Sequence, residues 1–169
     1  MNNKKRMMFV LEEDYYYITM KIISILQYMN CINSKLVDYR KISYIISCTT
    51  DDETLKLFCK SIDDYNSLSI IERERLLDMY YKGSLNQPIV KRVLFFLEKK
   101  NIICIVKNHN YGCIDVNLVK NKHLKDIFIN EYFKEDRQRI NTFYKKYNRV
   151  RSVKYETFIF KVFGSSEVF

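Results

Sequence analysis

Residues 88–100 carry apolar side chains at helical spacing. The stripe consists of Val90, Val93, Leu94 and Leu97. Pro88 suits the first turn of a helix, because its missing N–H would have no partner there, and Asn101 stands where a left-handed residue often ends one. The pattern therefore predicts a helix over 88–100.

The period then changes from helical to extended. Residues 102–106 and 113–118 are apolar, β-branched runs, and they flank the turn sequence KNHNYG. Gly112 in this turn permits a positive φ. We predict a β-hairpin directly after the helix.

A second helix is predicted just before this one. Ser69 and Glu72 have the spacing of a capping box, and Gly83 stands where a left-handed, helix-ending residue belongs. The four residues 84–87 would form a short turn between the helices. Two helices, a turn and a hairpin predict a winged helix-turn-helix-like core over 69–118, although any helical hairpin has a similar outline in sequence.

Helices are also predicted on both sides of this core. The N-terminal part, 15–61, would hold helices over 15–29, over 34–47 with Ser34 as cap, and over 52–62 with Asp51 or Asp52 as cap. Residues 65–68 are predicted to be a connection.

The C-terminal part, 120–169, is predicted to begin with a short helix over 120–130 and a longer one over 133–150. The longer helix has an apolar stripe and a basic remaining surface. Its basic side chains are Lys134, Arg137, Arg139, Lys145, Lys146, Arg149 and Arg151. The tail, 152–169, fits neither period; we expect it to dock as a helix or strand, since so many aromatics would be costly in water.

The chain has 169 residues, and we predict a single domain over 1–169. The fold class is mainly α with a small β-hairpin, a winged helix-turn-helix-like core having flanking N- and C-terminal helices. A chain of this length can bury roughly 70% of its extended surface, so no metal or disulfide is required. The chain has only three glycines and one proline, the residues that most often interrupt regular structure, and this favours long helices.

The five cysteines are Cys31, Cys48, Cys59, Cys104 and Cys113. Their odd number and mostly apolar surroundings predict reduced core thiols, with no metal or cofactor. No apolar run approaches the roughly 20 residues needed to span a bilayer. The apolar stretch near the N-terminus is too short for a signal peptide. We therefore expect a soluble, cytoplasmic protein without a membrane partner.

Positive charge is concentrated in the second half of the chain. Residues 1–81 carry 11 basic and 12 acidic side chains, a balance of −1, and residues 82–169 carry 18 and 8, a balance of +10. A basic half of this kind serves nucleic acid, membrane headgroups or an acidic protein partner, or only solubility.

The outer face of the helix over 88–100 is predicted to present Arg92, Phe95 and Lys99, flanked by Lys91 and Glu98. It has few groups suited to reading base edges. An aromatic residue ringed by charges is typical of a protein-interface hot spot. Three interpretations remain open for Phe95: burial beneath the N-terminal helices, contact with a partner protein, or contact with nucleic acid.

Enzymatic interpretations have little support. The chain has two histidines. His109 lies in the hairpin turn beside Asn108 and Asn110 and is expected to be a solvated loop residue, and His123 has no acidic or cysteine neighbour at ligand spacing. Cys113 with His109 is a formal redox or hydrolytic pair. The acidic run from Asp51 to Glu53 is explained more simply as a helix cap, and no Gly-rich phosphate loop exists.

Four segments together resemble a known family. ITMKIISILQYMN, KLVDYRKISYIIS, PIVKRVLFFLEKKNIICIV with its hairpin, and FKEDRQRINTFYKKY follow one another over residues 15–150. In order and pattern they resemble the middle components of bacterial ABC three-component systems, such as the small accessory subunit of Lamassu-type anti-phage defence complexes.

The resemblance implies a non-catalytic adaptor that bridges an SMC-like ABC ATPase and a nuclease effector in a DNA-sensing complex. It carries no catalytic residue over. The candidate contacts with a partner protein, or with DNA through the basic surface, come from the residues themselves: Lys91, Arg92, Phe95, Lys99, Lys100, Lys107, Arg137, Lys145 and Lys146.

The alternative function is a winged-helix DNA-binding regulator or replication initiator. In that case Lys91, Arg92 and Lys99 would contact phosphates, and the KNHNYG wing would enter a minor groove.

Overall fold

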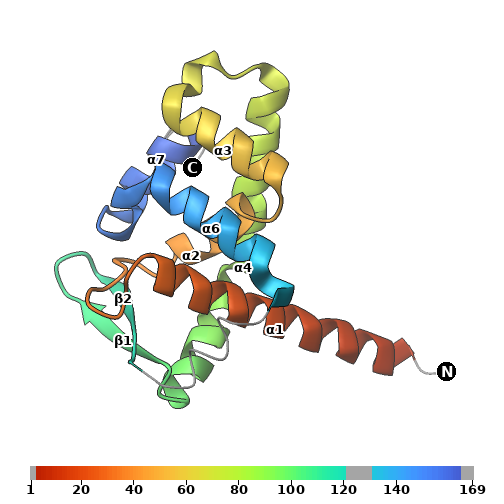
Figure 1. The fold of residues 1–169 in the computed structure, drawn as a ribbon, viewed down its shortest axis with the longest axis vertical. Helices are drawn as coiled ribbons and strands as arrows, with labels where there is room; N and C mark the ends of the chain where they lie inside the picture. Colours follow the sequence, from red (N-terminus) through yellow and green to blue (C-terminus); the bar gives the residue numbers. More distant parts are fainter. Residues whose placement is uncertain (1–2, 121–130, 165–169) are drawn as a thin grey trace.

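The computed structural model describes residues 3–120 and 131–164, and residues 3–14 by their backbone alone (Figure 1). It is mainly helical with one antiparallel hairpin, which confirms the predicted fold class at this level. In chain order the elements are α1 (Asn3–Tyr28), α2 (Lys41–Cys48), α3 (Asp52–Asp64), η1 (Tyr65–Ser67), α4 (Ile70–Lys99), β1 (Ile103–Asn108), β2 (Cys113–Leu118), η2 (Glu131–Phe133), α6 (Lys134–Lys146), η3 (Asn148–Arg151) and α7 (Tyr155–Phe163).

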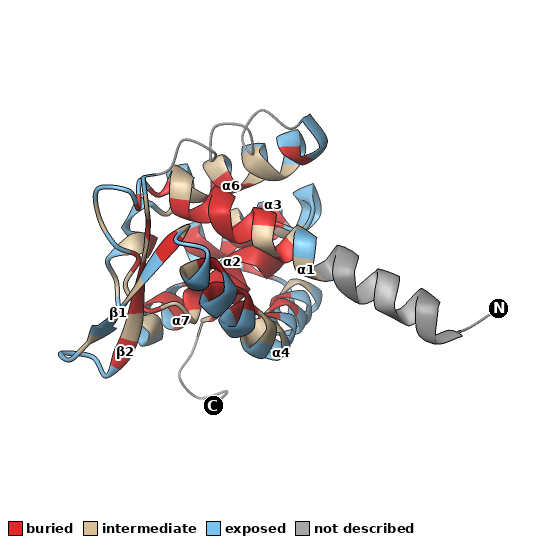
Figure 2. Cartoon of the chain, turned by 90° about the horizontal axis from the view of Figure 1, so that it is seen from below, coloured by how far each residue is buried: buried red, intermediate tan, exposed pale blue. Residues whose placement is uncertain are grey.

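The short helix α2 lies at the centre of the molecule, and all of its residues are buried (Figure 2). One hydrophobic core joins it to the surrounding helices and to the inner face of the hairpin. Stacked rings of Phe58 and Phe143, with centroids 4.2 Å apart, connect α3 to α6. The predicted inward face of the first helix is confirmed, since Ile18, Ile22 and Leu26 are buried.

Residues 34–40 form no helix, so the prediction of a helix over 34–47 was wrong in its first half. This segment lies along β2 instead. Leu36 N–H donates to the Val116 carbonyl at 2.8 Å, and Tyr39 N–H donates to Ile114 at 2.8 Å. These bonds satisfy backbone groups on a sheet edge that would otherwise be unpaired, which explains why the extended form is preferred.

Two of the three predicted helix caps are confirmed, whereas Ser34 begins no helix and its hydroxyl donates to the Asn30 carbonyl at 2.9 Å. The Asp51 carboxylate accepts from Thr54 N–H at 2.8 Å, which begins α3. At the start of α4, Ser69 and Glu72 form the reciprocal capping box. The predicted connection at 65–68 includes the short 3-10 helix η1.

The predicted turn at 84–87 does not exist, because α4 runs without a break from Ile70 to Lys99. Gly83 does not end a helix. It is buried against the Tyr44 ring, where a Cβ atom would lie 2.5 Å from Tyr44 Cδ1. Pro88 lies inside the helix and is exposed. The helix-turn-helix part of the predicted core is therefore wrong.

The predicted hairpin is confirmed, and its register places Ile103 opposite Leu118 and Asn108 opposite Cys113. Gly112 and Asn101 both have the expected positive φ, 63° and 55°. The first strand continues two residues beyond the predicted end at Val106.

A buried polar cluster fixes the hairpin to the helical body. The Lys41 ammonium donates to the carbonyls of Val150 and Val153, at 2.6 and 2.7 Å. The buried Asp115 carboxylate accepts from Asp38 N–H at 3.1 Å and pairs with Lys35 at 2.7 Å. The bonds of Asp115 attach the hairpin to the segment before α2, and those of Lys41 attach α2 to the segment around η3.

The C-terminal part differs from its prediction in one detail. The helix expected over 133–150 ends at Lys146 and is followed by η3. The tail contains α7, whose buried residues are Phe158, Ile159, Val162 and Phe163. Its expected docking on the core is thus confirmed, and as a helix. The helix predicted over 120–130 lies outside the described residues, apart from Lys120.

Three of the predicted core thiols are buried, Cys31, Cys48 and Cys113, whereas Cys59 is half-buried and Cys104 is exposed on β1. Among the described residues, no helix has the length and apolar character needed to cross a membrane.

Candidate partner-binding surface

The C-terminal half of α4 has one face in the core and one in solvent. The predicted inward stripe of Val90, Val93, Leu94 and Leu97 is buried. Phe95 is 47% exposed, so the interpretation that it packs beneath the N-terminal helices is wrong. The predicted contacts Lys91, Arg92, Lys99 and Lys100 are exposed beside it, and Lys107 is exposed on β1.

Sequence reasoning missed a second aromatic on this surface, Phe96, which is 54% exposed. The Lys100 ammonium lies 5.7 Å from the centre of its ring. The sequence contained a signal for this residue. Adjacent residues on a helix point 100° apart, so the narrow buried stripe could not be expected to cover both Phe95 and Phe96.

A groove runs between α1 and α4 at this point. It has a volume of about 680 Å³ and is lined by Tyr15, Tyr16, Thr19, Arg92, Val93 and Phe96. Three of its six lining residues are aromatic, and Arg92 contributes one guanidinium. Tyr16 is 55% exposed and its ring meets Phe133 of η2 edge-on, which holds the α1 side of the groove in place.

The cations Lys91, Arg92 and Lys99 lie beside the groove. Within the described residues, no ion pair joins Lys91, Arg92 or Lys99 to an acidic side chain. The nearby Glu98 carboxylate is engaged, since it accepts from Ile105 N–H at 3.1 Å. This part of the surface therefore combines exposed aromatic area with uncompensated positive charge.

The remaining predicted contacts, Arg137, Lys145 and Lys146, lie on α6. Figure 2 shows α6 and α4 on opposite sides of the molecule. Lys146 is engaged in an ion pair with Asp63 of α3, at 2.5 Å. The structure therefore does not bring the α6 cations to the groove.

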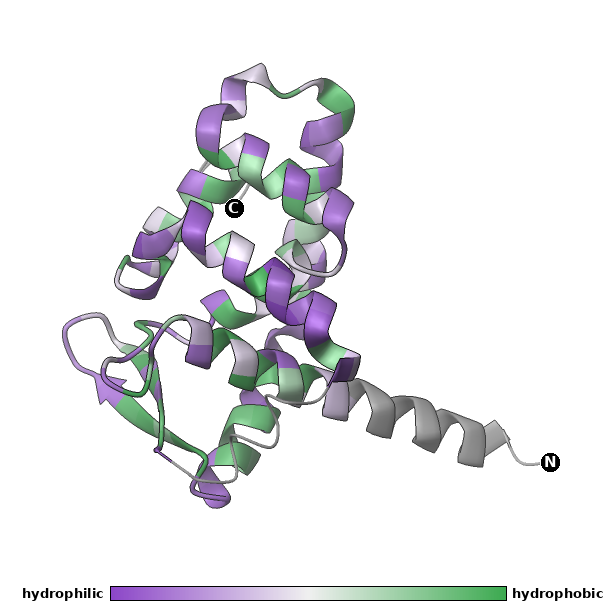
Figure 3. Cartoon of the chain, in the orientation of Figure 1, coloured by the Kyte–Doolittle hydropathy of each residue, from purple (hydrophilic) through white to green (hydrophobic). Residues whose placement is uncertain are grey.

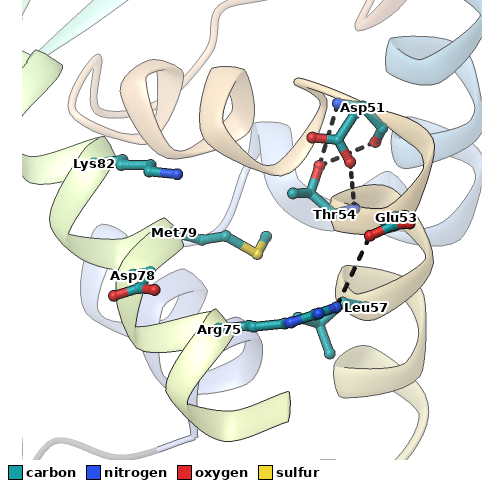
Figure 4. Close-up of a pocket in the computed structure, with 8 residues that line it drawn as sticks. All are labelled: Asp51, Glu53, Thr54, Leu57, Arg75, Asp78, Met79 and Lys82. Atoms are coloured by element: carbon teal, nitrogen blue, oxygen red, sulfur yellow. Dashed lines mark hydrogen bonds and ion pairs between the residues drawn. The ribbon is translucent and has the colours of Figure 1, made fainter. Parts of the chain in front are cut away.

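The acidic run from Asp51 to Glu53 is used within the fold. Asp51 caps α3, Asp52 pairs with Arg139 at 2.7 Å, and Glu53 reaches Arg75 of α4 at 3.9 Å across a polar pocket (Figure 4). In the described part of the chain, no group of three or more His, Cys, Asp or Glu side chains could hold a metal ion.

The formal pair of Cys113 and His109 does not form in this structure. The Cys113 thiol lies 3.7 Å from the Asp115 carboxylate, whereas His109 is exposed in the turn. Burial, together with the carboxylates of Asp38 and Asp115, raises the pKa of the Cys113 thiol. A thiol held in its protonated form is a poor nucleophile.

Comparison of the chain with protein-family models, with curated proteins and with solved structures found no match.

Proposed function

We propose that this protein is a non-catalytic adaptor that binds a partner protein in the groove between α1 and α4. The observation that carries the proposal is the exposure of Phe96 and Tyr16 on opposite walls of an apolar groove. Large aromatic side chains in such a position bury much area at low entropic cost, and they dominate the energetics of many interfaces.

The chemistry of the groove selects a helix with an apolar face and acidic flanks. An apolar face would fill the space between Tyr16, Val93 and Phe96. Acidic flanking residues would pair with Arg92 and Lys100 at its edge. Opposite charges at a rim steer association and fix orientation more than they add affinity.

The family resemblance suggests which proteins would supply the partner helix. The partner helix would belong to an SMC-like ABC ATPase or to a nuclease effector, and the chain would bridge the two in an anti-phage DNA-sensing complex. The coiled-coil arms of such an ATPase offer helices whose apolar seam is bordered by charged residues.

DNA binding is the second candidate, and the exposed cations Lys91, Arg92, Lys99, Lys100 and Lys107 favour it. They are suited to phosphates rather than base edges. The continuity of α4 removes the separate recognition helix that a winged helix-turn-helix would insert into a major groove. We therefore rank protein binding first.

Co-purification from cells that also carry the neighbouring genes tests the proposal, with an SMC-like ATPase and a nuclease as the expected partners. The tagged wild-type chain is expected to recover both partners, and Phe96→Asp to reduce their recovery at least about tenfold. Phe160→Asp is the matched control, because Phe160 is 59% exposed on α7, away from the groove, and should retain both partners. Recovery of the wild-type chain alone would overturn the adaptor function.

A parallel titration of a DNA duplex separates the two candidates. For a protein-binding groove, Arg92→Glu weakens partner recovery, and the purified chain binds DNA only weakly and without sequence preference. Tight, salt-dependent and sequence-specific binding by the purified chain would instead support the regulator.

A further inference from the structure

Helix α4 has an exposed apolar stripe opposite its buried face. The helix has 30 residues, which corresponds to a length of roughly 45 Å. Its large exposed hydrophobic side chains are Ile70 (77%), Ile71 (66%), Leu77 (37%), Tyr81 (53%), Leu85 (77%), Phe95 (47%) and Phe96 (54%). Figure 3 shows hydrophobic bands toward both ends of this helix.

Five of these side chains lie on one narrow face of the helix, whereas Ile71 and Phe96 lie about 20–40° beyond its edge. At 100° per residue, positions 70, 77, 81, 85, 88, 92, 95 and 99 fall within an arc of roughly 80°. The buried residues Leu76, Met79 and Val90 lie on the opposite side. Single exposed hydrophobics are common, but a stripe with the 3–4 spacing of a helix-packing seam along a whole helix indicates a missing helical partner.

The charges on the stripe and at its edge are divided between its halves. Glu74 lies on the stripe and Asp78 about 20° beyond its edge, both in the N-terminal half, and the basic residues Arg92 and Lys99 lie in the C-terminal half. Figure 4 shows the Asp78 side chain directed away from Met79 and from Arg75. A helix with this charge order is complementary to a copy of itself running in the opposite direction.

We propose that the stripe on α4 is covered by α4 of a second copy of this chain, packed antiparallel about a two-fold axis near Leu85. Asp78 precedes Leu85 by seven residues and Arg92 follows it by seven, so the axis brings Asp78 of one copy to Arg92 of the other. Leu85 meets its own counterpart at the axis. A parallel pairing would instead place Asp78 beside Asp78 and Arg92 beside Arg92.

The self-association surface and the groove are distinct. The groove lies on the flank of α4 that faces α1, where Val93 and Phe96 line it, whereas the seam is centred on Leu85 and includes Phe95. The two adjoin at Arg92. Self-association therefore goes beyond the adaptor function and does not depend on it.

Sedimentation analysis of the purified full-length chain tests the inference. The wild type should form dimers that dissociate on dilution. Leu85→Glu should weaken the dimer at least about tenfold, because it places two like charges at the axis. Far-UV circular dichroism should show unchanged helix content, since Leu85 is 77% exposed. Phe160→Glu, a change at an exposed residue outside the stripe, should leave the dimer intact.

A charge exchange tests the antiparallel register. Asp78→Lys alone and Arg92→Glu alone should each weaken the dimer, and the double variant should recover most of the wild-type affinity, because each copy again offers opposite charges. A monomeric wild type, a dimer unaffected by Leu85→Glu, or a double variant weaker than both single variants would each overturn the proposal. Loss of partner recovery in Phe96→Asp with an intact dimer would separate the groove from the seam.

Discussion

Gly83 in the middle of α4 lies directly against the ring of Tyr44 from α2. The Tyr44 ring is fixed in position because it is fully buried. Its hydroxyl lies 2.8 Å from that of Tyr155 and accepts from the Gln87 side-chain amide at 3.1 Å. The absence of a side chain at Gly83 thus sets the distance between the two helices.

Gly83→Ala should destabilise the protein by about 1–3 kcal/mol through overpacking, even though Ala is the better helix former. Urea unfolding measures the change. Lys82→Ala, at the exposed neighbouring position, is the control and should lie within about 0.5 kcal/mol of wild type. A Gly83→Ala variant more stable than wild type would show that α4 and α2 can separate freely.

Pro88, unlike Gly83, should cost the protein stability. Inside a helix a proline removes one backbone hydrogen bond, here the one to the Ser84 carbonyl, and Pro88 is exposed, so its ring contributes little packing. Pro88→Ala should therefore stabilise the protein by about 1–3 kcal/mol in thermal or urea unfolding. If residues 84–87 formed a turn, Pro88 would begin a helix and its replacement would be neutral or unfavourable.

Lys41 should make stability depend on pH. Burial lowers its pKa from 10.5 to about 8, with Asp38 and Asp115 opposing the shift. Between these pH values the unfolded chain holds a proton that the folded chain has released, so the contribution of this lysine to stability rises as pH increases from 8 to 10.5.

Lys41→Met measures this contribution. At pH 7.5 the variant should lose roughly 2–4 kcal/mol, because two buried carbonyls lose their donor. At pH 10 the difference from wild type should be larger by about 1–3 kcal/mol. A difference that is constant or smaller at pH 10 would contradict the lowered pKa of Lys41.

Asp115 should control the attachment of the hairpin. Its buried carboxylate accepts from Asp38 N–H, from the Asn108 amide at 2.9 Å and from Lys35. Asp115→Ala leaves a buried donor unsatisfied and should cost about 2–4 kcal/mol. In this variant, hydrogen exchange of the β2 backbone amides should accelerate more than that of the α2 amides. Lys35→Ala removes only the half-exposed partner and should cost less than about 1 kcal/mol.

The sequence predicted those elements that depend on local chemistry. The caps at Asp51 and Ser69, the end of α4 near Asn101 and the turn at Gly112 all appear where their residue types require them. The prediction of a turn at 84–87 was wrong because glycine can permit close packing as well as end a helix, and proline can lie within a helix as well as begin one. Gly83 is needed for close packing on Tyr44, a residue about 40 positions earlier in the chain, so no local pattern reveals its role.

The candidate surface was also predicted only where it depends on local pattern. A helical wheel places Arg92, Phe95 and Lys99 in solvent, and the structure agrees. The groove required α1 to pass beside α4, which no local pattern indicates. Lys145 and Lys146 looked equivalent to the α4 cations by charge, but their helix lies on the opposite side of the molecule (Figure 2).

The docking of α7 also affects how the protein folds during synthesis. Ser61 of α3 donates to the carbonyl of Val162, and Tyr44 of α2 packs against the rings of Phe158 and Phe163. The centre of the core is therefore completed about 100 residues after α2 and α3 are made. Until α7 leaves the ribosome, α2 and α3 have no cover on this side. The nascent chain therefore exposes this apolar surface until α7 is made, and exposed surface of this kind is prone to aggregation.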